Sequence, residues 1–106
     1  MKKYKILWSK PATKDLENII DFIANDNKSN ALKILKKIEK RVYELEEIPQ
    51  RGSIVDELDA FNLYKYKQLI EYPWRIIYRI GDDSVFIMAV LDGRRHITDV
   101  LKNRKL

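Results

Sequence analysis

The chain has 106 residues, of which 45% are apolar and 35% charged, and its net charge is +5. This composition is typical of a globular protein and excludes a disordered tail, so we expect one domain over residues 1–106. The absence of cysteine and the single His96 exclude disulfides and argue against thiolate or histidine metal sites. No segment has the apolar length of a membrane span or a signal peptide. We therefore expect a cytoplasmic protein without a metal or another cofactor.

The N-terminal segment predicts a strand followed by a helix. Over residues 3–8, Tyr4, Ile6 and Trp8 alternate with Lys5 and Leu7, which is typical of a strand. Ser9 is then a good N-cap, and Pro11 suits the first turn of a helix. The apolar residues of this helix recur at helical spacing and form one stripe: Leu16, Ile19, Ile20 and Ile23.

A second amphipathic helix is expected over residues 30–48. The polar residues 26–29 break the first helix and can cap the second, which Pro49 should end because proline cannot continue a helix. Two amphipathic helices with so short a link form an antiparallel hairpin. Since neither helix can bury its whole stripe on the other, a sheet is the expected partner.

The C-terminal half predicts three strands. Residues 50–62 are polar and are expected to be irregular, whereas residues 63–71, 74–80 and 84–91 are rich in β-branched and aromatic residues. Short turns join these segments into an antiparallel meander, and a short helix is expected near the C-terminus. The predicted fold is α+β with the order β-α-α-β-β-β-α, a helical hairpin packed on a small antiparallel sheet.

Basic residues concentrate in the same half. Residues 61–106 hold 9 basic and 5 acidic residues, a net +4, whereas residues 1–60 hold 12 and 11, a net +1. Strand alternation predicts that Lys65 and Lys67 share one face of their strand, as Arg75 and Arg79 do of theirs. Such cations can bind phosphates. The other interpretation is an ordinary basic surface with ion-paired arginines.

The order of these segments resembles that of the RelE/ParE toxins. YKILWSKPATKDLENIIDFIA resembles their first strand and helix, and EIPQRG, YKYKQL, WRIIYRI and VFIMAVLDGRRHI follow in the family's order. The resemblance covers nearly the whole chain. It implies the toxin of a type II toxin–antitoxin (plasmid stabilisation) module, neutralised by a cognate antitoxin protein.

The resemblance also implies candidate site residues. RelE-like members cut messenger RNA on the ribosome without a metal, by attack of the ribose 2′-hydroxyl on the adjacent phosphate, which requires a base, an acid and cations. The RelE pattern places these catalytic roles on Lys65, Lys67, Arg75 and Arg95. Further nucleic-acid contacts are expected from Arg79, Arg94, His96, Lys102 and Arg104. Leu101 stands where RelE has its base-stacking tyrosine.

Two alternatives to a ribosome-dependent mRNA endoribonuclease stay open. The long second helix, the GRRHI segment and the missing tyrosine are more similar to ParE-like members, which poison DNA gyrase and are not nucleases. A non-toxic nucleic-acid-binding module on the same scaffold is the second alternative. The set of four basic residues favours the endoribonuclease, with gyrase as the alternative target.

Overall fold

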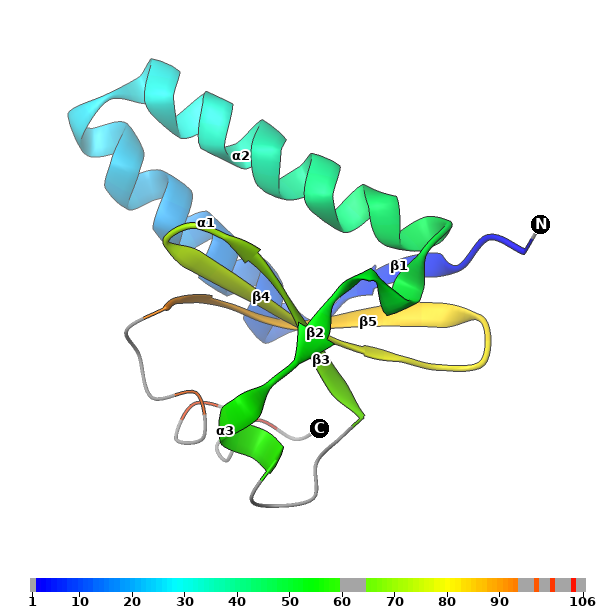
Figure 1. The fold of residues 1–106 in the computed structure, drawn as a ribbon. Helices are drawn as coiled ribbons and strands as arrows, with labels where there is room; N and C mark the ends of the chain where they lie inside the picture. Colours follow the sequence, from blue (N-terminus) through cyan, green and yellow to red (C-terminus); the bar gives the residue numbers. More distant parts are fainter. Residues whose placement is uncertain (1, 60–64, 94–96, 98–99, 101–103, 105–106) are drawn as a thin grey trace.

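The computed structural model describes residues 2–59, 65–93, 97, 100 and 104. Strand β1 (Lys5–Trp8) leads into helix α1 (Lys10–Asp26), and helix α2 (Lys28–Tyr43) runs back alongside it. Short 3₁₀ turns η1 (Glu44–Glu46) and η2 (Pro49–Arg51) then lead to strand β2 (Ser53–Ile54) and helix α3 (Asp56–Asp59). Strands β3 (Tyr66–Glu71), β4 (Trp74–Ile80) and β5 (Ser84–Asp92) complete the sheet (Figure 1). None of the described helices is both long and apolar enough to cross a membrane.

The helix caps follow from the sequence. The Ser9 side chain accepts a hydrogen bond from the Ala12 backbone N–H at 3.1 Å, and Asn27 caps α2 through the Asn30 N–H at 2.9 Å. Both caps satisfy backbone donors that a first helical turn leaves free. The predicted end of the second helix is wrong, because α2 ends at Tyr43 and a 3₁₀ turn follows. Pro49 begins η2 instead of ending the helix.

The predicted order β-α-α-β-β-β-α and the purely antiparallel sheet are also wrong. The sheet has five strands in the order β1-β5-β4-β3-β2, and β1 pairs in parallel with β5. Residues 50–62, expected to be irregular, contain β2 and α3. Both errors concern pairings between distant segments, which local periodicity does not report. Most of the expected C-terminal helix lies outside the described residues, and of it Ile97 and Val100, both in helical conformation, are described.

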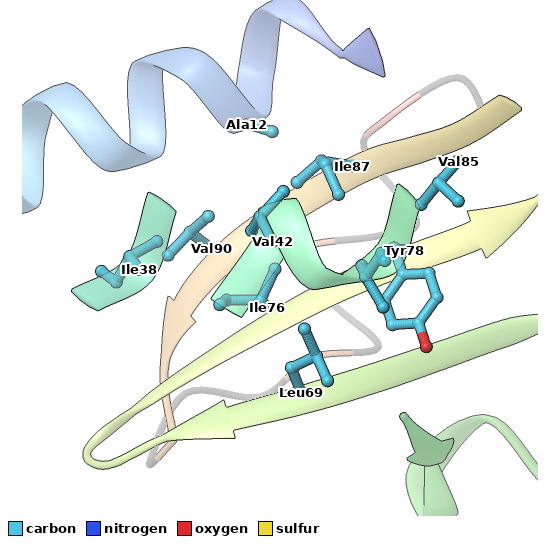
Figure 2. Close-up of a cluster of buried hydrophobic side chains, with 10 residues drawn as sticks. Ala12, Ile38, Val42, Leu69, Ile76, Tyr78, Val85, Ile87 and Val90 are labelled. Carbon is cyan, nitrogen blue, oxygen red and sulfur yellow. The ribbon is translucent and has the colours of Figure 1, made fainter. Parts of the chain in front are cut away.

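Helices α1 and α2 cover one face of the sheet, called here the hairpin face. Ala12, Ile38 and Val42 of the helices pack against Leu69, Ile76, Tyr78 and other sheet residues (Figure 2). The Tyr78 hydroxyl donates to the Pro49 carbonyl at 2.7 Å and accepts from the Gly52 N–H at 2.9 Å. A Cβ on Gly52 would lie 2.5 Å from that hydroxyl oxygen, so only glycine fits this approach.

The opposite face of the sheet, called here the far face, has a core of its own. Tyr66, Ile77 and Ala89 of the sheet pack there with Val55 and with Leu58 of α3, which lies on the other side of the sheet from the hairpin (Figure 1). The β4–β5 register shifts from Ile77↔Ala89 to Tyr78↔Ile87, which leaves Met88 as an extra residue in β5. This bulge places both Met88 and Ala89 in the far-face core.

Candidate functional site

The predicted cations of β3 and β4 lie on opposite faces of the sheet. Lys67 stands opposite Tyr78, which belongs to the hairpin-face core. Arg75 stands opposite Ile70 of β3 and Leu91 of β5, and Leu91 belongs to the far-face core. Since residues directly opposite each other in a sheet share a face, Lys67 and Arg75 point away from each other.

Arg75 is engaged within the molecule. Its two terminal nitrogens donate to the Glu57 carboxylate, with Nη2 2.8 Å from Oε1, and its Nε donates to Gln68 Oε1 at 2.8 Å. The arginine side chain is only 11% exposed. Hydrogen bonds from the Arg75 guanidinium hold the pKa of the Glu57 carboxyl below its ordinary value, although partial burial opposes this shift. Arg75 therefore joins α3 to the sheet through a bidentate ion pair.

Two further predicted cations, Arg79 and Lys65, contact aromatic rings. The Arg79 guanidinium carbon lies 4.2 Å from the centre of the Phe86 ring, and Lys65 Nζ lies 5.3 Å from that of Tyr66. Burial raises the pKa of the Tyr66 hydroxyl, although the nearby Arg79 charge opposes the shift. These contacts are cation–π pairs. Arg79 stands opposite Tyr66 on the far face, the same face as Arg75, as strand alternation predicts.

Arg104, expected to contact nucleic acid, forms an ion pair with helix α1. Its Nη1 and Nη2 donate to the two Asp15 carboxylate oxygens at 2.8 and 2.7 Å, and Nη1 also donates to the Met88 carbonyl at 3.0 Å. Asp15 in turn accepts the Val90 N–H at 2.9 Å. The network satisfies backbone groups of β5 at and beside the bulge, where β1 no longer pairs with it.

The remaining predicted residues lie outside the described part of the chain: Arg94, Arg95, His96 and Lys102. Of the four expected catalytic residues, Lys65 immediately precedes β3 and Lys67 lies in it, whereas Arg75 is on the face of the sheet opposite Lys67. Among the described residues, no three His, Asp or Glu side chains lie close enough to hold a metal ion. The three described catalytic candidates thus do not meet at one point.

A groove runs between the helical hairpin and β1, which is an edge strand of the sheet. It has a volume of about 520 Å³, and its lining is mainly apolar: Ile6, Trp8, Thr13, Leu16, Glu39, Val42, Tyr43 and Glu46. A second hollow adjoins it at Tyr43 and Glu46 and extends to Ile48. Tyr43 is 68% exposed. An aromatic residue on the polar side of an amphipathic helix is the one sequence signal of this groove.

Comparisons with known proteins agree on one family. Residues 6–97 match the family model described as the ParE toxin of the type II toxin–antitoxin system parDE. The chain is 25% identical over 95 residues to Toxin ParE3 of Caulobacter vibrioides, an alignment that covers 88% of this chain and 90% of that protein.

Two solved structures have a similar fold. One is the chromosomal ParDE toxin–antitoxin system from P. aeruginosa, with a TM-score of 0.67, 18% identity and coverage of 85% of this chain and 96% of that chain. The other is the toxin–antitoxin complex RelBE2 from Mycobacterium tuberculosis, with a TM-score of 0.64, 21% identity and coverage of 87% and 93%. At these low sequence identities, the two structures show only that the fold is similar.

Proposed function

The chain belongs to the ParE toxin family of type II toxin–antitoxin systems, and on that premise we propose that it stops bacterial growth by poisoning DNA gyrase. The ParE-like members of the superfamily act in this way. The proposal takes up the alternative target that the sequence left open, in place of messenger RNA cleavage.

The observation that carries this choice is the separation of Lys67 from Arg75. Cleavage by a 2′-hydroxyl requires a base, an acid and charge-stabilising groups around one phosphate, and these groups must lie within hydrogen-bond reach. Here the two cations lie on opposite faces of the sheet. The Glu57 carboxylate already occupies the two terminal nitrogens of Arg75. A nuclease site built on Lys65, Lys67 and Arg75 would require this ion pair to break.

The test is to induce the toxin and map DNA breaks and RNA ends within minutes. We expect double-strand DNA breaks, a DNA-damage response and intact messenger RNA. The variant Lys65→Gln/Lys67→Gln keeps much of the side-chain volume and removes both charges, and it should stay toxic. New RNA ends with a 2′,3′-cyclic phosphate, lost in this variant, would overturn the gyrase proposal and restore the endoribonuclease.

We also propose that the cognate antitoxin covers the groove between β1 and the hairpin. Both similar structures are of toxin–antitoxin systems. The groove combines apolar side chains from β1, α1 and α2 with the carboxylates of Glu39 and Glu46. An amphipathic antitoxin segment that folds on binding could bury the apolar lining, with basic residues at its margins meeting the two carboxylates.

A matched pair of aromatic substitutions tests the groove. Tyr43→Lys places a charge at the groove, whereas Phe22→Lys makes the same kind of change at a residue that is 78% exposed and does not line it. Exposed tyrosines that become buried often dominate binding. We expect Tyr43→Lys to weaken antitoxin binding more than tenfold in calorimetry, and Phe22→Lys to leave it unchanged. Equal effects would place the antitoxin elsewhere.

A further inference from the structure

Helix α2 is the most basic of the described helices. Residues 28–41 contain six basic residues and one acidic residue, a net charge of +5, which equals that of the whole chain. Counting charge by halves of the sequence conceals this segment, because acidic residues elsewhere in residues 1–60 cancel it. Charge available to a partner therefore has to be located on the structure.

Four lysines of α2 form a row on its outer side: Lys33, Lys36, Lys37 and Lys40. All four are exposed, whereas Ala31, Ile38 and Val42 of the same helix are buried. Helical geometry places residues three and four apart as neighbours, so each of these lysines adjoins two of the others. At about 1.5 Å per residue, the row from Lys33 to Lys40 is about 10 Å long. Figure 1 shows α2 along the border of the molecule, with the sheet on its other side.

These lysines differ from the described arginines in having no internal partner. Arg41, Arg51, Arg75 and Arg104 each form ion pairs with carboxylates, and Arg79 covers Phe86. Within the part of the chain that the structure describes, no carboxylate lies within ion-pair distance of the four lysine ammonium groups, although Glu39 is on the same helix. A partner can reach them without breaking a contact.

We propose that this lysine row binds the phosphate backbone of duplex DNA without reading its sequence. Lysine ammonium groups on flexible side chains act as point charges, which suits phosphates and not base edges. Duplex DNA carries one phosphate of each strand per about 3.4 Å of helix axis, so a row of about 10 Å laid parallel to the axis covers the axial rise of about three phosphates of one strand. The exposed Tyr43 lies three residues beyond Lys40, at one end of the row. A single ring there cannot stack successive unpaired bases along the row, which argues against single-stranded RNA. This inference does not depend on the proposed gyrase target.

The experiment compares two triple variants of the purified full chain. Lys33→Gln/Lys36→Gln/Lys40→Gln removes three charges from the row, and glutamine keeps the helix propensity of lysine. Lys5→Gln/Lys10→Gln/Lys14→Gln removes three charges from other exposed lysines. Affinity for a short mixed-sequence DNA duplex is measured by fluorescence anisotropy over about 50–200 mM salt, because the slope of log affinity against log salt counts the neutralised phosphates.

We expect the row variant to bind the duplex more than tenfold more weakly and to lower the salt slope by about 3, close to one per lysine. The control variant should keep a slope near that of the unmodified chain. Equal losses in the two variants would mean that only net charge matters and would overturn the proposal. Tighter binding of single-stranded RNA, or binding of polyglutamate but not of the duplex, would also overturn it, in favour of an RNA or an acidic protein partner.

Discussion

Helix α2 and the far face of the sheet are both basic in sequence but differ in what their charges do. On the far face, Arg75 and Arg79 contact Glu57 and the Phe86 ring, and both hold parts of the fold together. On α2, the lysine row contacts no described carboxylate. The comparison teaches that the number of basic residues in a segment does not measure the charge that it offers to a partner.

The physical reason is the difference between the two side chains. A guanidinium is planar and presents five donors that match a carboxylate in pairs, so arginine is well suited to partly buried ion pairs. A lysine ammonium is compact and strongly hydrated, and it usually stays in water on the outer side of a helix. Far-face arginines are therefore expected to affect stability, and α2 lysines to affect binding.

The largest expected effect on stability distinguishes the buried side of α2 from its exposed side. Ile38 is fully buried between the helices and the sheet, so Ile38→Ala should lower the free energy of unfolding by about 2–5 kcal/mol through the cavity it leaves. Lys36→Gln, two residues away on the exposed side, should change it by less than about 0.5 kcal/mol. Urea denaturation measures both. A large loss in Lys36→Gln would mean that the lysine row is structural.

A smaller loss of stability is expected when the ion pair between Asp15 of α1 and Arg104 is broken. Asp15→Asn keeps the shape of the side chain but removes its charge, while Arg104 stays only 16% exposed. Since a hydrogen bond to a charged group contributes about 1.5–3 kcal/mol, we expect a loss in that range. Double-mutant analysis with Arg104→Gln, followed by thermal unfolding, should give a coupling energy well above zero. Additive effects of the two substitutions would show that the pair does not stabilise the fold.

The smallest effect is expected at Glu57. Its side chain is 43% exposed, so solvent screens the ion pair and Glu57→Gln should cost no more than about 1 kcal/mol at neutral pH. The folded pKa of Glu57 is lowered from 4.5, so its stabilising contribution is complete above that pH and is lost as the pH falls through the lower, folded value. The stabilities of Glu57→Gln and the unmodified chain should therefore converge below about pH 4.5. A difference in stability that persists at this low pH would assign the effect of the substitution to packing.

Local signals in the sequence were sufficient for most elements. The Ser9 cap, the break near Asn27 and the strands over residues 74–80 and 84–91 are confirmed, because capping and alternation act between neighbouring residues. The pairing of β1 with β5, the bulge at Met88 and the short β2 were not predicted. They depend on which distant segments meet.

For the candidate site, too, local signals were sufficient for some features, and others depend on which distant segments meet. Alternation correctly placed Arg75 and Arg79 on one face of β4, which the paired register confirms. It could not show that Lys67 lies on the other face, because the relative register of two strands is set by their pairing. The catalytic roles of Lys65, Lys67, Arg75 and Arg95 stay predictions.

By itself the sequence determined the helical hairpin, the three C-terminal strands and the toxin family, since each depends on local pattern or on the order of segments along the chain. Only the tertiary structure decided which cations are available. Glu57 meets Arg75 and Asp15 meets Arg104 across 18 and 89 residues of chain. Such ion pairs form when packing brings distant segments together, and packing, unlike periodicity, is a property of the whole fold.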